Sequence, residues 1–178
     1  MSEDPTPYRA SLPATAEPKV WQVMDAMQRA MAEQEQVEVP VQHSFTGSAE
    51  NGTGIYSRTV VMPEGALVMS EVHLTEHPFV ITRGRVRVLM ADGVFEVLQA
   101  PHRGVTKPGT RRLLLIEEET EWTTFHATPL TDPEEIGRQI LLQTPWHGLK
   151  QSSPSALQPS EPVPPTRQET QAPRLLEM

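Results

Sequence analysis

The sequence contains no cysteine, and only 5% of its residues are aromatic. Without cysteine the chain has no disulfides, no thiolate zinc ligands and no thiol nucleophile, so packing alone must hold the fold. Basic residues are also in the minority, because 15 lysines and arginines face 23 acidic residues and leave a net charge of −8. This charge repels phosphate backbones, and no basic cluster with interleaved aromatics offsets it, so nucleic acid is not an expected partner.

Long apolar runs are missing as well. The longest, such as residues 113–116, are far too short to span a bilayer. The first residues, 1–5, are acidic and lack the apolar core of a secretory signal. We therefore expect a soluble intracellular protein with no membrane partner.

Proline is concentrated toward the ends of the chain, and this composition predicts three parts. Residues 1–17 combine three prolines with few apolar side chains, so they predict an N-terminal arm. Residues 145–178 are rich in proline, serine and glutamine, which is typical of an extended tail. The stretch between them, residues 18–144, is expected to form one domain with a single core.

Two helices are expected at the ends of this domain. Residues Trp21, Met24, Met27 and Met31 recur at spacings of three and four, which places them on one apolar helix face. That face packs either on the body of the domain or on a neighbouring subunit, since methionine adapts to irregular surfaces. The second helix is predicted after residues 131–135, where a capping side chain precedes a proline and two acids.

Strand-like runs separated by turn residues fill the stretch between the two helices. The predicted strands are Ile55–Met62, Leu67–His73, Phe79–Thr82, Arg85–Met90, Val94–Gln99, Arg112–Glu117 and Trp122–Ala127. A loop over 47–54 should lead into the first of them, and the acidic run 117–121 should be a charged turn. The clearest hairpin signal is Asp92-Gly93. Regular short strands predict a mainly β fold, a sandwich or barrel.

The segment 65–84 has a spacing typical of one β family. It begins and ends with glycine and contains Glu71, His73 and His77. In spacing it resembles the first cupin motif, with Glu71 in place of the first histidine and His77 in place of the glutamate. The segment 108–112 resembles the second motif, with Arg112 in place of its histidine. This resemblance covers roughly residues 55–127 and implies a single cupin-type jelly-roll barrel, here with a helix before it and a helix after it.

In a narrower way the chain is similar to small cupin-like proteins of tailed bacteriophages. The shared features, in order, are Pro40-Val41-Gln42-His43-Ser44-Phe45, Ile55-Tyr56-Ser57-Arg58, Met62-Pro63-Glu64-Gly65, the His73 and His77 pair, Ala100-Pro101, Lys107-Pro108-Gly109-Thr110-Arg111-Arg112 and Trp122-Thr123-Thr124-Phe125-His126. This similarity implies a phage origin. It implies a location in the virion, and in the host cytoplasm during assembly.

Three interpretations of the polar residues in this region stay open. Glu71, His73 and His77 supply two imidazoles and a carboxylate, with His126 as a further ligand, which would suit iron, manganese, nickel or zinc. The fixed positive charge of Arg112 disfavours such a metal and would pair with Glu71 in a purely structural barrel interior. In the third interpretation Arg112 and the histidines hold a small anion.

The preferred function is a non-enzymatic phage structural or assembly protein, such as a virion decoration, cement or connector-type accessory, with no cofactor. The arm, the first helix and the tail would then contact further copies of this chain and other virion subunits, so a homo-oligomer is expected. The alternatives are a metal-dependent cupin enzyme of the dioxygenase or isomerase type, and a small-anion-binding module.

Overall fold

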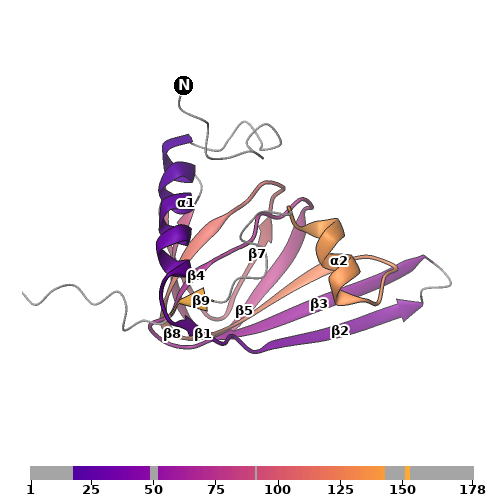
Figure 1. Ribbon diagram of the computed structural model, residues 1–178. Helices are drawn as coiled ribbons and strands as arrows, with labels where there is room; N and C mark the ends of the chain where they lie inside the picture. The colour runs from indigo at the N-terminus through magenta and orange to yellow at the C-terminus, as the bar shows by residue number, and fades with distance from the viewer. Residues whose placement is uncertain (1–17, 49–51, 91, 143–150, 153–178) are drawn as a thin grey trace, which may run out of the picture.

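The computed structural model describes residues 18–48, 52–90, 92–142 and 151–152 (Figure 1). The predicted arm 1–17 and most of the predicted tail 145–178 lie outside the described residues. Within them the elements are α1 (Pro18–Ala32), β1 (Gln36–Val37), β2 (Val41–Ser48), β3 (Thr53–Met62), β4 (Leu67–Met69), β5 (His77–Met90), β6 (Phe95–Gln99), β7 (His102–Thr106), β8 (Arg112–Ala127), α2 (Pro133–Ile140) and β9 (Gln151–Ser152).

All strand pairs are antiparallel, and two long strands, β5 and β8, form the centre of the sheet. The first half of β5 and the second half of β8 lie between β7 on one side and β3 and β2 on the other. The other halves of β5 and β8 lie between β6 on one side and β4, β9 and β1 on the other. The predicted mainly β class is confirmed. A closed barrel is not shown, because over the described ranges the strand order ends at β1 and β2.

The two halves meet at a corner where the prediction of two separate strands, 79–82 and 85–90, was wrong. The segment is one strand, β5, whose register against β8 shifts between Ile81 and Val86. Gly84 lies inside this stretch with a φ of 91°. Sequence reasoning took the glycine for a strand end, whereas the structure uses it as an irregularity within a continuous strand.

The acidic run 117–121 is not a turn, which corrects a second prediction, because β8 continues through it. Glu117 accepts ion pairs from Arg85 at 2.9 Å and from Arg87 at 2.5 Å. Glu119 pairs with Arg83 at 2.8 Å. Since the arginines of β5 face these acids across the ladder, the acidic stretch can remain extended.

Other strand limits also differ from the prediction. Most of the predicted loop 47–54 that the structure describes belongs to the ends of β2 and β3, and β2 and β7 were not predicted as strands. The predicted strand 67–73 ends at Met69. The hairpin at Asp92-Gly93 is confirmed, with β5 paired to β6 from Arg85↔Gln99 to Leu89↔Phe95.

Three groups of buried side chains hold these elements together. The main core draws residues from both halves of the sheet and includes Phe79, Ile81 and Trp122. α1 packs its methionine face on Leu67, Met69 and Leu113 of β4 and β8, so the first of the two packing alternatives for this helix is confirmed.

The second helix, α2, begins behind the N-cap Asp132 and buries Ile136 and Ile140 against Tyr56 of β3. It lies over β3 at the opposite end of the sheet from α1 (Figure 1). No helix in the described part of the chain combines the length and apolar character that crossing a membrane requires.

Candidate metal centre

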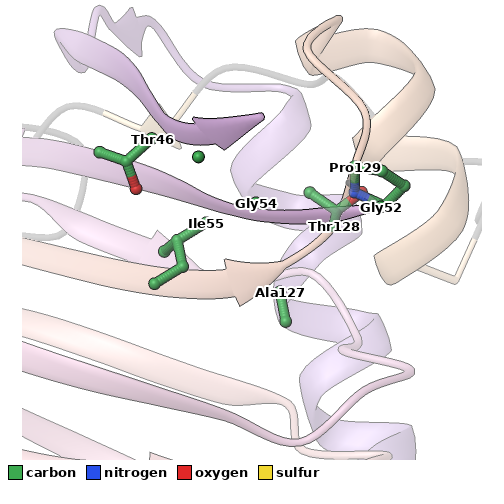
Figure 2. A pocket seen from close by; sticks show the side chains of 8 residues that line it. Thr46, Gly52, Gly54, Ile55, Ala127, Thr128 and Pro129 are labelled. Carbon is green, nitrogen blue, oxygen red and sulfur yellow. The ribbon is translucent and has the colours of Figure 1, made fainter. Parts of the chain in front are cut away.

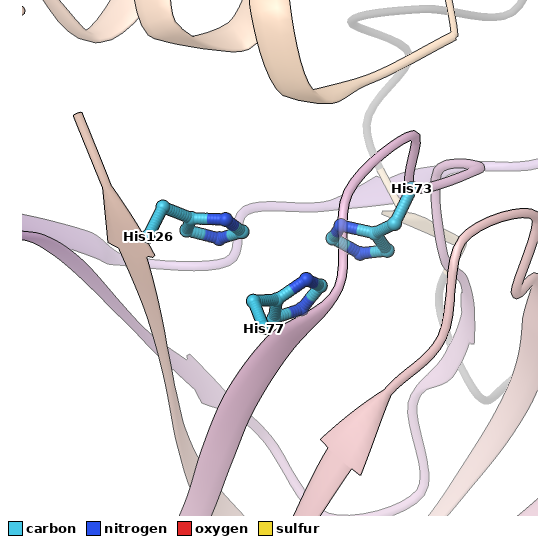
Figure 3. Close-up of side chains that lie close together, drawn as sticks. All are labelled: His73, His77 and His126. Atoms are coloured by element: carbon cyan, nitrogen blue, oxygen red, sulfur yellow. The ribbon is translucent and has the colours of Figure 1, made fainter.

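Three histidines meet at the end of the sheet near α2 (Figure 3). His77 is the first residue of β5 and His126 is the last but one of β8. The β5–β8 register pairs Phe79 with Thr124, and continued by two residues it places His77 opposite His126. Because side chains on a strand alternate between faces, both histidines project to the same side of the sheet as Phe79.

The third histidine, His73, comes from the loop between β4 and β5. Its backbone N–H donates to the carbonyl of Thr110 at 3.3 Å, and its carbonyl accepts from Gly109 N–H at 2.7 Å. The flanking Leu74 donates to the carbonyl of Ile140 at 2.8 Å. The loop is therefore held on one side by the segment before β8 and on the other by the end of α2.

The three imidazoles are close and largely buried. One ring nitrogen of each residue lies within 4.8 Å of one nitrogen of each of the others. Ring centroids are 4.4 Å apart for His73 and His77, 4.2 Å for His77 and His126, and 6.2 Å for His73 and His126. His77 and His126 are only 2% and 3% exposed, and His73 is half-buried.

Each ring has a buried nitrogen without a hydrogen-bond partner: His73 Nδ1, His77 Nε2 and His126 Nδ1. The tautomer of His77 follows from its other nitrogen, because Nδ1 lies 3.1 Å from the carbonyl of Thr75 and must donate to it. The lone pair of its Nε2 is then directed into the cluster. A backbone carbonyl that orients an imidazole in this way is a common support for a metal ligand.

All three histidines are neutral near pH 7. Burial, together with the neighbouring His77, His126, Arg112 and Arg58, lowers the pKa of His73 to about 2. Burial, His77 and Arg58 lower the pKa of His126 to about 4. Burial also lowers the pKa of His77, against the carbonyl of Thr75, which raises it. Neutral imidazoles are the form that binds a metal.

These pKa shifts predict that the metal-free protein loses stability in acid. Below pH 6.5, the pKa of an unfolded histidine, His73 and His126 bind protons in the unfolded chain but not in the folded protein. Stability therefore falls as the pH drops below 6.5, down to about 4 for the contribution of His126 and on toward about 2 for that of His73. Urea unfolding at pH 7 and at about pH 5 should show this loss, and the His126→Gln variant should lose less between the two pH values. An equal loss in both proteins would contradict the assignment.

The other two predicted site residues lie differently. Glu71 does not belong to the metal-ligand group among the described residues, and its charge acts on Arg58, whose pKa it raises against the effect of burial. Arg112 is buried, and its guanidinium donates to the hydroxyl of Thr106. The carboxylate whose charge acts on Arg112 is that of Glu96. These contacts differ from the predicted pairing of Arg112 with Glu71.

Sequence reasoning missed Tyr56, which borders the cluster. Tyr56 is paired with His126 across the β3–β8 ladder, and the two ring centroids are 6.0 Å apart. Its hydroxyl lies 2.7 Å from Nδ1 of His43 on β2. Only the register of β3 against β8 could have revealed this neighbour, because 70 positions of sequence (126 − 56) separate the two residues.

An open groove lies at the ends of β2, β3 and β8 (Figure 2). It is lined by Thr46, Gly47, Gly52, Gly54, Ile55, Ala127, Thr128 and Pro129. No residue in this lining has a side chain that ionises, and no ring of the histidine cluster takes part in it. The groove therefore offers no side chain for acid–base chemistry.

No protein-family model and no curated protein sequence matches the chain. Similar solved structures include ectoine synthase from P. lautus, with 8% identity over 64% of this chain and 83% of that chain and a TM-score of 0.45. The Cnp3 cupin domain of Schizosaccharomyces pombe has 17% identity over 65% and 76%, with a TM-score of 0.42. A cupin superfamily protein from Desulfitobacterium hafniense has 11% identity over 54% and 83%, with a TM-score of 0.39.

Two of these three proteins are named as cupins. Similarity at this level does not extend to activity, ligand or partner. The phage origin, the virion location and the oligomeric contacts stay predictions.

Proposed function

We propose that the protein binds a divalent transition metal through His73, His77 and His126 and is a metal-dependent enzyme acting on a small molecule. One observation carries the proposal: each of the three imidazoles keeps a buried ring nitrogen without a hydrogen bond, and one nitrogen of each lies within 4.8 Å of the others. Imidazole nitrogen suits zinc, iron, nickel and copper. The chain has no cysteine to offer a softer site.

Burial without partners argues for a ligand rather than for a structural cluster. A buried polar atom that lacks a hydrogen bond costs about 1–3 kcal/mol, and this cluster contains three of them. A metal would satisfy all three at once. Bonds of about 2.0–2.1 Å require ligand nitrogens within about 4.2 Å of one another. The ligand nitrogens now lie within 4.8 Å of one another, so small rotations of the rings would meet that requirement.

The number of protein ligands is typical of a catalytic metal site rather than of a closed structural one. Three protein ligands leave at least one coordination position open, which is typical of catalytic sites. A metal bound there would supply Lewis-acid activation of a small molecule or of water. The Thr75 carbonyl fixes the orientation of His77, and the end of α2 holds the loop that carries His73.

We expect protein purified without chelator to contain about one equivalent of zinc, iron or nickel. His73→Ala, His77→Ala and His126→Ala should each lower the metal affinity by at least 10- to 100-fold, because each removes one of three ligands. His43→Ala is the matched control, since His43 is an exposed histidine on β2 outside the cluster. Metal content is measured by mass spectrometry and affinity by titration of the metal-free protein.

The metal should also raise the unfolding temperature of the wild-type chain and of His43→Ala, but not of the three cluster variants. A wild-type protein that takes up no metal, and whose unfolding temperature is the same with and without chelator, would refute the proposed function.

A further inference from the structure

Arg112 is a buried cation at the start of β8 and is 7% exposed. Its guanidinium lies over the rings of Phe79 and Trp122, at 5.5 and 5.9 Å from their centroids. Both terminal nitrogens donate to the hydroxyl of Thr106, at 3.2 and 3.3 Å. The backbone N–H of Arg112 donates to Ser70 Oγ at 2.8 Å, which fixes the start of the strand.

The guanidinium of Arg112 has more N–H donors than the residues around it offer acceptors. It carries five N–H groups, and Thr106 is the one hydrogen-bond acceptor that the described part of the chain gives them. Buried arginines are ordinarily paired with a carboxylate, because an unpaired buried charge is costly. The buried Arg111 next to it follows that rule and pairs with Asp25 at 2.6 Å. Within the described residues Arg112 therefore forms no ion pair like that of its neighbour, and Glu96 acts on it only through its charge.

The free donors lie beside the histidine cluster. Thr106 on β7 is the cross-strand partner of His77 on β5, so their Cβ atoms are about 4.5–5.5 Å apart. Arg112, bonded to Thr106, is thus one side chain away from a proposed metal ligand. The charge of Arg112 also lowers the pKa of both His73 and His77, as expected for groups in the same interior.

The charges at this place are unbalanced once a metal is bound. The metal would add two positive charges among neutral imidazoles and the guanidinium contributes one more, whereas Glu96 is the one carboxylate whose charge acts on Arg112. A buried site with this excess favours an anionic ligand. A carboxylate fits best, because its two oxygens match the planar fork of a guanidinium.

We infer that the substrate of this site is a small organic acid. Its carboxylate binds the free N–H groups of Arg112 beside Thr106, while an oxygen outside the carboxylate reaches the metal. The inference rests on the proposed function and deepens it by naming the substrate class. The aromatic rings of Phe79 and Trp122 form the apolar wall behind the guanidinium.

The test uses the full-length chain loaded with zinc, with pyruvate as the probe and pyruvamide as its uncharged counterpart. Calorimetric titration should give pyruvate an affinity at least tenfold above that of pyruvamide. Arg112→Gln should weaken pyruvate binding by about 10- to 100-fold, the effect of losing hydrogen bonds to a charged group. The matched control is Arg103→Gln, which changes an exposed arginine on β7 and should bind like the wild type.

The outcomes separate the two proposals. If Arg112→Gln holds zinc as the wild type does and binds pyruvate equally well, the substrate class is wrong and the metal centre stands. If the wild type takes up no zinc, the metal centre is wrong. Titration of the metal-free chain with pyruvate then decides whether Arg112 alone holds an anion. If Arg112→Gln binds pyruvate as well as the wild type does, the carboxylate site at Arg112 is wrong too. If Arg112→Gln does not fold, equal affinities of the wild type for pyruvate and pyruvamide overturn the inference.

Discussion

Asp25→Ala should lower the free energy of unfolding by about 3–5 kcal/mol, the cost of removing one partner of a buried ion pair. Asp25 on α1 and Arg111 before β8 are joined at 2.6 Å, and both side chains are 3% exposed. Arg111 also donates to Gln28 and lies 5.2 Å from the ring of Trp21. Without Asp25 the guanidinium would keep its charge in a site that no longer compensates it.

The effect should reach the histidine cluster. Arg111 directly follows the segment whose Gly109 and Thr110 bind the backbone of His73. Loosening α1 from Arg111 should therefore weaken metal binding as well as stability. Urea unfolding measures the first effect and metal titration the second.

Two further variants distinguish the ion pair from general damage to α1. Gln22→Ala changes an exposed side chain on the same helix and should alter stability by less than about 0.5 kcal/mol. Asp25→Ala combined with Arg111→Leu should cost less than the sum of the two single changes, because it leaves no unpaired charge. A loss below about 1 kcal/mol for Asp25→Ala would show that the pair contributes little.

Gly84→Ala should lower the free energy of unfolding by about 2–5 kcal/mol, the sum of backbone strain and forced overlap. Its φ of 91° is unfavourable for any residue with a Cβ. An added Cβ would also lie 2.2 Å from the carbonyl oxygen of Glu119 and 2.7 Å from Cα of Thr120. Both contacts are with backbone of the adjacent β8, so neither strand can yield without disturbing the corner.

Gly52→Ala is the control for this prediction. Gly52 has a φ of 64°, but an added Cβ would meet nothing within 4 Å. It should therefore cost only the strain, about 1–2 kcal/mol. Thermal and urea unfolding of the two variants separate the cost of backbone strain from the cost of forced overlap. Equal losses would mean that the close approach of β5 and β8 at Gly84 does not matter.

Local features of the fold were predictable because their signals lie within a few residues. The stripe that includes Trp21 and Met24 marks the buried face of α1. Asp92 and Gly93 mark the β5–β6 hairpin, where the side chain of Asp92 accepts from Val94 N–H at 3.0 Å. The four candidate ligands were likewise chosen by residue type and spacing, and three of them come together.

The sequence by itself therefore determined the mainly β class, the helix face of α1, the hairpin at residues 92–93 and the histidines worth considering. The tertiary structure decided how those histidines are used, because the β5–β8 register places His126 opposite His77 while Glu71 stays out of the cluster. It also decided that the acidic run 117–121 is strand and that Arg112 bonds to Thr106. The physical reason is the same in each case: the partner that neutralises, pairs with or faces a side chain comes from a distant strand, and composition and spacing do not contain that pairing.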